Sequence, residues 1–393
     1  MRLHPAVLLT LAASWAASGQ PYTISTFAGG RLPVNIPGTS ANLFAPAAVT
    51  VDAAGNVFFV DGHDVLRLDA KTGALTVVAG NGTPGFSGDD GLATNAQFDD
   101  PQGLAIDSAG NLYIADGSGS VRKVSNKVIT TVAGSPLGPT GGKAGTGPNG
   151  DNGPATSAVL SSPHGVAVDS AGNLYIADTN HNRIRKVASG VITTVAGGGF
   201  QISGSGPATS AGLGNPQGVA VDSTGNVYIA DTQDNLIRKV SNGAIATMAG
   251  GGQSYPGDGG PATSAVLSYP LGVAVDSTGN LYIASTIDLR IRKISNGMIA
   301  TVAGGGGSVG DSGPAAAAQL NFPTSVALDS AGNLYIADTY DSRVRKVSGG
   351  VIATVAGGGS SGLGDNGPAT SAQLAYPQGV ALDSAGNLYI ADS

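Results

Sequence analysis

The chain alternates short apolar segments with polar, glycine-rich turns, and the same order of segments returns seven times. In the copy that starts at Pro163 the apolar segments are GVAVD, NLYIAD, IRKV and ITTVAG, and Ser-Ala-Gly separates the first two. Short β-branched and aromatic segments predict strands, and Gly in the connecting turn predicts a hairpin because Gly accepts a positive φ. Each full copy therefore predicts four antiparallel strands, which we name a, b, c and d in chain order.

The copies begin at regularly spaced prolines. Successive starts lie 53 to 55 residues apart, except for one interval of 62 residues. A fixed period of this length is typical of solenoids and propellers. One unit has apolar residues on both faces, so it needs neighbours, and a ring covers every unit. The pattern predicts one all-β propeller of four-stranded antiparallel blades, with copies that start at Pro46, Pro101, Pro163, Pro216, Pro270, Pro323 and Pro377.

The number of blades depends on how the last copy closes the ring. After six complete sets, the seventh copy supplies only strands a and b. Thr23–Phe27 reads like a strand d, so we favour a seven-bladed ring in which this segment is the outer strand of an incomplete last blade. Six blades with spare strands is the alternative. Contacts of residues 379–390 with both the Pro46 and the Pro323 copies would favour seven.

The connectors between strand d and the next strand a are also regular. The sequence GDGGPATSAVL, which begins at Gly257, predicts a capped helix of about two turns because Pro is common at the first helical position. Capping is the favoured role of the aspartate in each connector. Calcium, which takes about 6–8 oxygen ligands, is the alternative. The weak metal candidates are Asp89, Asp151, Asp258, Asp311 and Asp365.

The first 19 residues have the pattern of a secretory signal peptide. Arg2 precedes the apolar run AVLLTLAASWA, and Ala17-Ser18-Gly19 offers small residues for cleavage. A buried N-terminal helix is the alternative. The propeller domain would then span residues 20–393, in a secreted, periplasmic or cell-surface protein. No later segment approaches the ~20 apolar residues of a membrane helix, and the absence of cysteine excludes disulfides and Cys-ligated zinc.

Charge argues against nucleic acid as the partner. The formal net charge is −7, and all 26 acidic residues are aspartate, whereas a nucleic-acid-binding surface is normally basic. We also expect few aromatic residues on the variable face. Most of the 19 Lys and Arg residues fall on strand c. We interpret them as solvated rim charges that pair with Asp116, Asp178, Asp231 and Asp338 at the ends of strand b, and a basic binding stripe is the alternative.

The unit Pro-x-Gly-Val-Ala-Val-Asp-x-x-Gly-Asn-Leu-Tyr-Ile-Ala-Asp-x-x-x-x-Arg-Ile-Arg-Lys resembles the NHL repeat. The connector resembles longer NHL repeats of bacterial secreted proteins and of the teneurin propeller. The copies at Pro163, Pro216 and Pro323 match best, and the copy at Pro46 departs most. Members of this family form propellers, usually with six blades, and they act as binding platforms for proteins or RNA or, in a few cases, as lyases. The resemblance implies these alternatives for function.

Differences between the copies gather on one face of the expected propeller. The d–a connectors and b–c turns share this face, whereas the nearly identical a–b turns lie on the other. We therefore predict a non-catalytic, secreted binding or scaffold module for a protein or carbohydrate partner, with neutral variation of exposed loops as the alternative. The site would centre near His164. The candidate binding residues are Gln102, His164, Asn180, His181, Gln217, Asp234, Thr324 and Gln378.

A metal-assisted lyase is the alternative function. The lyases that the repeat resembles need several histidines near the propeller axis, and only His164 stands at a strand-a entrance. His63 and His181 fall in b–c turns, which lie further out. We therefore assign no catalytic residue and expect no cofactor.

Overall fold

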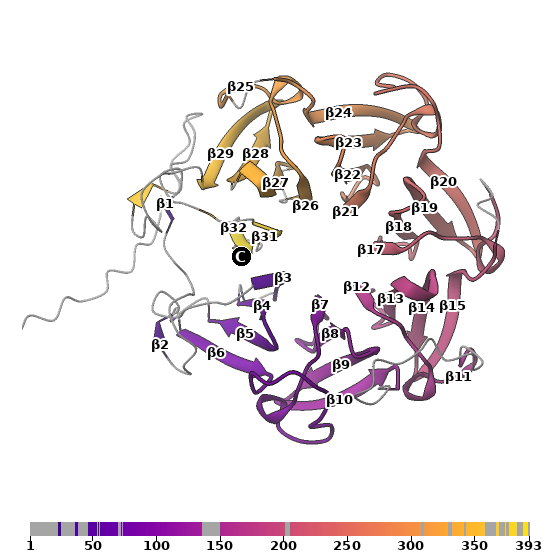
Figure 1. Ribbon diagram of the computed structural model, residues 1–393, viewed down its shortest axis with the longest axis vertical. Helices are drawn as coiled ribbons and strands as arrows, with labels where there is room; N and C mark the ends of the chain where they lie inside the picture. Colours follow the sequence, from indigo (N-terminus) through magenta and orange to yellow (C-terminus); the bar gives the residue numbers. More distant parts are fainter. Residues whose placement is uncertain are drawn as a thin grey trace, which may run out of the picture.

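The structure, a computed structural model, is a ring of short antiparallel sheets around a central opening (Figure 1). It describes residues 23–24, 36–37 and 46–393, the last range without 53, 55, 70–71, 73, 136–149, 201–204, 308–309, 329–331, 342, 358–366, 369–373, 375–376, 383–387 and 392–393. The expected signal peptide and Asp365 lie outside the described residues. No helix in the described part is long and apolar enough to cross a membrane.

The predicted four-stranded antiparallel blades are confirmed, and strand a of each lies nearest the centre (Figure 1). Blade one consists of β3 (Pro46–Val51), β4 (Val57–Asp61), β5 (Asp64–Leu68) and β6 (Ala74–Ala79); blade two of β7 (Pro101–Ile106), β8 (Leu112–Asp116), β9 (Ser120–Ser125) and β10 (Val128–Ala133); and blade three of β12 (Pro163–Val168), β13 (Leu174–Asp178), β14 (Arg183–Ala188) and β15 (Val191–Gly197). Blade four consists of β17 (Pro216–Val221), β18 (Val227–Asp231), β19 (Leu236–Ser241) and β20 (Ala244–Gly250); blade five of β21 (Pro270–Val275), β22 (Leu281–Ser285), β23 (Arg290–Ser295) and β24 (Met298–Gly304); and blade six of β26 (Pro323–Leu328), β27 (Leu334–Asp338), β28 (Arg343–Ser348) and β29 (Val351–Gly357).

In the part of the chain that the structure describes, six blades are complete, which was the alternative count. The last copy forms a separate two-stranded sheet of β31 (Gly379–Leu382) and β32 (Leu388–Ala391). This sheet contacts both β26 of blade six and β3 of blade one (Figure 1). The expected incomplete last unit is therefore present between these blades, but it does not reach four strands in the described part of the chain. From the N-terminal segment, β1 (Thr23–Ile24) pairs with β30 (Gly367–Pro368).

The core consists of repeated layers between adjacent blades. Strand b is buried over its whole length in blades two to six because each of its faces meets a neighbour. Tyr113 and Ala115 of blade two, for example, pack in one cluster with Leu174 and Ile176 of blade three. The same Tyr-Ala to Leu-Ile packing recurs around the ring, which explains why NLYIAD hardly varies between copies. Burial of these apolar side chains is the main favourable term in folding.

The connector helices are shorter than expected. In the five connectors that the structure describes, the helix is a three-residue 3-10 turn without a side-chain cap, such as η3 (Ala155–Ser157). The preceding Gly153–Pro154 forms β11, which pairs with the outer strand β15, and the Ala155 N–H bonds to Gly190 O. Short strands of this kind, β2 (Ile36–Pro37), β16 (Ser205–Pro207) and β25 (Gly313–Pro314), extend three more blades. The backbone groups of the connector thus enter the sheet, so no two-turn helix forms.

The prediction that these charges are solvated is wrong for five arginines, although two of the predicted pairs, with Asp178 and Asp338, are present at 3.5 Å. In blades two to six, the arginine that directly precedes lysine on strand c is fully buried. These residues are Arg122, Arg185, Arg238, Arg292 and Arg345. Four of them form ion pairs with the connector aspartates, at 2.6 Å to Asp89, 2.7 Å to Asp151, 2.7 Å to Asp258 and 2.8 Å to Asp311. The lysine that follows places its ammonium 5.1–5.4 Å from the centre of a strand-b tyrosine ring. Strand c is thus basic because each blade uses these charges internally.

Candidate functional site

The entrance of each strand a lies close to the next blade. In the motif Pro-x-Gly the glycine has no room for a side chain: a Cβ on Gly103 would lie 2.0 Å from His164 O, and one on Gly165 would lie 2.4 Å from Gln217 O. The same close approach recurs at Gly218 and Gly272. This contact fixes position x in blades three to six. Six residues occupy this position around the central opening in blades two to six and in the last copy. They are Gln102, His164, Gln217, Leu271, Thr324 and Gln378.

Blades two to four present polar side chains at this opening. Gln102 Nε2 donates a hydrogen bond of 2.6 Å to Asp100 Oδ1, and Gln217 Nε2 donates one of 3.1 Å to Asn215 Oδ1. Burial lowers the pKa of His164 from its ordinary value, and the nearby Asp100 carboxylate opposes this shift. The imidazole is therefore mainly neutral at pH 7 and can both donate and accept a hydrogen bond.

Thr324 and Gln378 form a separate hydrogen-bonded contact at the opening. Thr324 Oγ1 donates to Gln378 O at 3.0 Å and lies 2.8 Å from Thr339 Oγ1. Leu271 of blade five stands between these residues and the polar side chains of blades two to four in ring order. The structure therefore distributes the predicted position-x candidates over two groups of blades.

The b–c turns place the remaining candidates further from the opening. Nδ1 of His181 lies 3.0 Å from Oδ2 of the fully buried Asp178. Exposed Asn180 belongs to the same turn, η4 (Thr179–His181). In blade four, Asp234 takes the place of His181. The Asn215 N–H bonds to Asn182 Oδ1, so the turn of blade three is joined directly to the strand-a entrance of blade four.

Blades four and six each hold a pair of carboxyl groups, one of which has a strongly shifted pKa. Burial raises the pKa of Asp231 to about 7, and Asp234 adds to this rise, whereas a hydrogen bond from Gly214 N–H opposes it. Burial likewise raises the pKa of Asp338 to about 7, and the negative charge of Asp341 raises it further. Like charges at a buried position disfavour ionisation of both groups. Blade five has Ser285 at the corresponding position, where its hydroxyl donates a hydrogen bond of 2.6 Å to Asp288.

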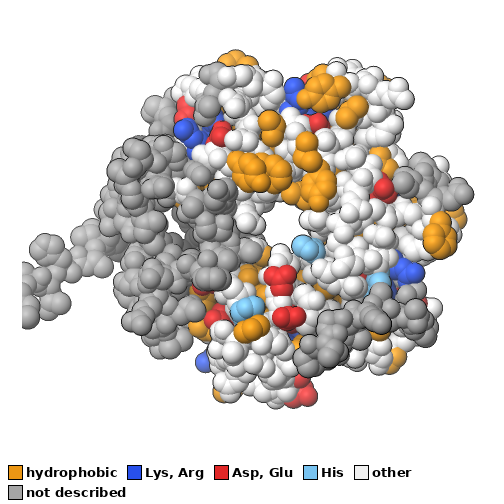
Figure 2. Space-filling model, viewed as in Figure 1, with side chains coloured by type: hydrophobic (Ala, Val, Ile, Leu, Met, Phe, Trp, Pro, Cys, Tyr) orange, Lys and Arg blue, Asp and Glu red, His pale blue; other side chains and the backbone are white. Residues whose placement is uncertain are grey.

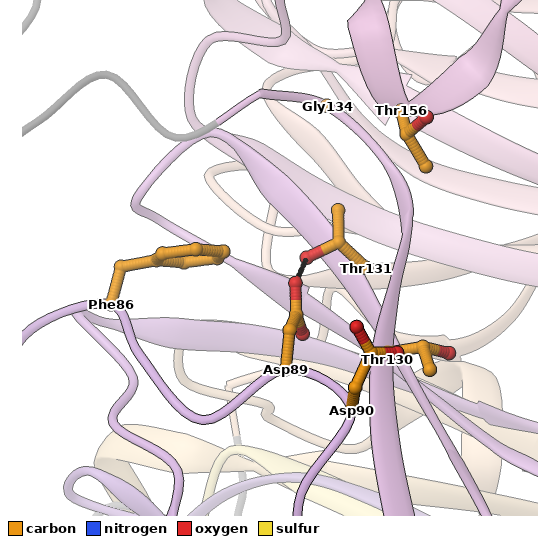
Figure 3. A pocket seen from close by; sticks show the side chains of 7 residues that line it. All are labelled: Phe86, Asp89, Asp90, Thr130, Thr131, Gly134 and Thr156. Carbon is orange, nitrogen blue, oxygen red and sulfur yellow. Dashed lines mark hydrogen bonds between the residues drawn. The ribbon is translucent and has the colours of Figure 1, made fainter.

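The described connector aspartates lie in separate blades, each beside its arginine. Asp89 illustrates the arrangement: it accepts hydrogen bonds from Arg122 and from Thr131 Oγ1, and it lines a hollow of about 290 Å³ with Phe86 and Thr156 (Figure 3). Within the described residues, no group of three or more His, Cys, Asp or Glu side chains could hold a metal ion. Metal binding at Asp89, Asp151, Asp258 and Asp311 stays a prediction.

Sequence reasoning missed a set of apolar side chains on the variable face and expected few aromatic residues there. Tyr340 is 54 % exposed, and its ring stacks on Phe322 with 4.5 Å between ring centres. Ile287 and Leu289 in the b–c turn of blade five are also exposed. A comparison of the copies could have found them, because one position of the b–c turn changes from polar to apolar. It is Asn180 in blade three and Gln233 in blade four, but Ile287 in blade five and Tyr340 in blade six.

The chain matches the NHL repeat over residues 160–187, 213–240 and 320–347, which lie in blades three, four and six. It is 28 % identical to the protein SUPPRESSOR OF QUENCHING 1, chloroplastic, of Arabidopsis thaliana, over 77 % of this chain and 30 % of that protein. It is 31 % identical to mouse (Mus musculus) teneurin-1 over 56 % of this chain and 9 % of that protein. The chain thus spans less than a third of the length of these two relatives.

The fold also resembles solved propellers. A streptogramin B lyase superposes with a TM-score of 0.57, covering 91 % of this chain and 93 % of the lyase, at 15 % sequence identity. Identity at this level supports the common fold alone, because one fold carries many different sites.

Proposed function

Because this chain is an NHL-repeat β-propeller, we propose that it is a non-catalytic binding module, which holds a protein or carbohydrate partner on the face formed by the d–a connectors and b–c turns. One observation carries the proposal. The glycine contacts recur in blades two to five and the buried b strands in blades two to six, whereas the side chains on this face differ from blade to blade. Recognition is therefore best placed where the repeat changes.

The polar part of this face is suited to hydrogen bonding. His164, Gln102 and Gln217 have half-buried side chains beside the opening. The strand-a glycine contacts fix the backbone at His164 and Gln217, and a hydrogen bond to Asp100 holds Gln102. Side chains whose positions are fixed before binding lose less conformational entropy on binding. In this proposal His164 is a hydrogen-bonding residue and needs no bound metal. The acidic composition, with a net charge of −7, makes nucleic acid a poor partner.

We also propose export of the protein, on the pattern of Met1–Gly19. Export would expose the face to extracellular or periplasmic partners. Cleavage of the leader in a secreting host, followed by mass spectrometry of the N-terminus, tests this part. An intact Met1 on protein recovered outside the cytoplasm would contradict it.

The binding proposal is tested with residues 20–393, probed with a carbohydrate array and with a displayed library of random dodecapeptides. We expect His164→Ala, His181→Ala and Gln217→Ala together to weaken the selected ligand at least tenfold, or ~1.4 kcal/mol, without lowering the melting temperature. Ser223→Ala with Ser277→Ala, in the exposed a–b turns of the opposite face, is the matched control. Loss of binding in the control alone would show that the functional face is the other one.

A further inference from the structure

Blades five and six carry large apolar residues where blades three and four carry polar ones. The residue before the strand-a proline is Ser162 in blade three and Asn215 in blade four, but Tyr269 in blade five and Phe322 in blade six. The b–c turns change in the same way, from Asn180 and Gln233 to Ile287 and Tyr340, and from Asn182 and Asn235 to Leu289 in blade five. We call Tyr269, Ile287, Leu289, Phe322 and Tyr340 the apolar patch.

Three residues of the apolar patch adopt a backbone conformation that bulky side chains disfavour. The φ angles of Tyr269, Leu289 and Phe322 are 53°, 58° and 58°. Asn tolerates this left-handed region, and Asn occupies it at residue 215 (φ 50°) and residue 235 (φ 57°) of blade four. Leu289 is also 36 % exposed, so burial in the ring does not fully compensate its strain. Strain of this kind is concentrated at functional sites.

The patch is continuous across the two blades. Phe322 and Tyr340 stack with 8° between their ring planes, and Tyr340 N–H bonds to Asn321 O. Ile287 N–H bonds to Ser268 O, next to Tyr269. Leu289 of blade five lines a hollow of about 450 Å³ together with Leu320. Leu320 lies in the connector just before the first strand of blade six. Figure 2 shows hydrophobic side chains gathered over β21, β22, β26 and β27, on one side of the central opening, and acidic and histidine side chains on the other.

The hollow beside the patch is lined by one acidic and one basic residue, Asp288 and Arg290. Asp288 follows Ile287 and lines the hollow, and Asp341 follows Tyr340. The Arg290 guanidinium lies 4.9 Å from the centre of the Tyr255 ring and bonds to its hydroxyl, so this cation is held within the blade. With a net charge of −7, the patch complements a ligand that is apolar at its centre and basic at its ends.

We propose that the apolar patch binds an extended peptide segment of another protein, in which one large apolar side chain lies next to Lys or Arg. The apolar side chain packs on Leu289, Ile287 and the Phe322–Tyr340 stack, and the basic residue pairs with Asp288. The aliphatic side chains favour a peptide over a sugar, which would stack on aromatic faces and need several hydrogen-bond partners. The neighbouring polar groups already bond to each other, as Asn321 Nδ2 does to Asp341 and Ser285 Oγ to Asp288.

The inference goes beyond the proposed function, because it adds a second site on blades five and six of the same face. The probe is a set of fluorescein-labelled dodecapeptides with one central Trp or Leu between lysines, measured by fluorescence anisotropy. Two matched sets replace the central residue by Ala or the lysines by Asp, and each change should weaken binding at least tenfold. The test variant Ile287→Gln, Leu289→Asn gives blade five the residues of blade four, and it should also lose at least tenfold in affinity.

The melting temperature separates recognition from a structural role. Asn is better suited than Leu to the φ of 58° at residue 289, so the variant should melt at the same or a higher temperature than the unchanged protein. A lower melting temperature would show that the patch supports the fold, and it would overturn the inference. The triple variant His164→Ala, His181→Ala, Gln217→Ala should bind these peptides normally.

Other occupants of the patch give different results. Carbohydrate binding that the Ile287→Gln, Leu289→Asn variant abolishes would overturn the peptide assignment, as would a dimer that the same variant converts to a monomer in light scattering. Peptides that bind the variant and the unchanged protein equally would overturn the inference but leave the proposed function standing. If no peptide or carbohydrate binds on any face, the proposed function itself fails.

Discussion

The two buried carboxyl pairs make stability depend on pH in a defined direction. The pKa values of Asp231 and Asp338 are raised to about 7, mainly by burial, whereas an unfolded Asp titrates near 3.9. The folded protein therefore binds more protons than the unfolded chain between about pH 4 and 7. The stability contributed by these protonated groups is fully present below pH ~4 and is lost as the pH rises through ~7.

The size of this effect follows from the shift. About three pKa units at ~1.4 kcal/mol each correspond to a fall of ~4 kcal/mol in unfolding free energy per carboxyl. The buried Arg345, 3.5 Å from Asp338, favours the ionised form and already limits this rise in pKa. Asp222 acts in the opposite direction at lower pH: burial opposes its ionisation, but hydrogen bonds from Asn226 and Thr224 lower its pKa to about 2. Stability should therefore be greatest near pH 4.

Urea unfolding followed by far-ultraviolet circular dichroism from pH 4.5 to 8 measures this dependence. Asp341→Asn removes the like charge beside Asp338, so it should reduce the fall by at least ~1 kcal/mol. Asp288→Asn is the matched control, because its neighbour is Ser285 and not an aspartate. A stability that is constant between pH 4.5 and 8, or an equal fall in the protein with and without Asp341→Asn, would refute the reasoning.

Two further predictions concern the ring itself. Gly103→Ala should lower the unfolding free energy by about 1–3 kcal/mol, because its Cβ would meet His164 O, whereas Gly313→Ala, with no atom within 4 Å of its Cβ, should change the melting temperature little. Equal effects of the two changes would contradict this explanation. Asp258→Asn should cost about 1–3 kcal/mol, less than the ~3–5 of a fully buried pair, because Asp258 is 37 % exposed. Asp151→Asn should cost less in parallel melts, since Arg185 keeps Asp178 at 3.5 Å, and a larger loss at Asp151 would argue against this role of the ion pairs.

The strands could be predicted because their information is local. NLYIAD has the composition of a buried strand, and the Ser-Ala-Gly turn fixes the hairpin, so the expected four strands per blade agree with β12 to β15. The period of the repeat was sufficient to predict a propeller. The number of complete blades was harder to predict because closure depends on how the two ends of the chain meet.

The ion pairs could not be predicted because they are not local. Arg185 and Asp151 are 34 residues apart and meet only when a connector crosses the outer part of its blade. A basic strand c looked exposed because charged side chains are rarely buried without a partner, and the partner lay in a segment that we interpreted as a helix cap. The apolar patch was overlooked for a different reason: its residues are far apart in sequence, and each resembles an ordinary loop substitution until Phe322 and Tyr340 are seen to stack.

The repeat explains how one face can carry two unlike surfaces. Blades two to five are each held by an interblade layer and a strand-a glycine, so an exposed residue in one turn can change without disturbing the others. Sites that share no contact have nearly additive effects on free energy. The polar residues around His164 and the apolar patch lie on different blades, so each can be selected for a ligand independently. The strained backbone at Leu289 is informative for this reason, because a blade with Asn at that position, such as blade four, forms the same four strands.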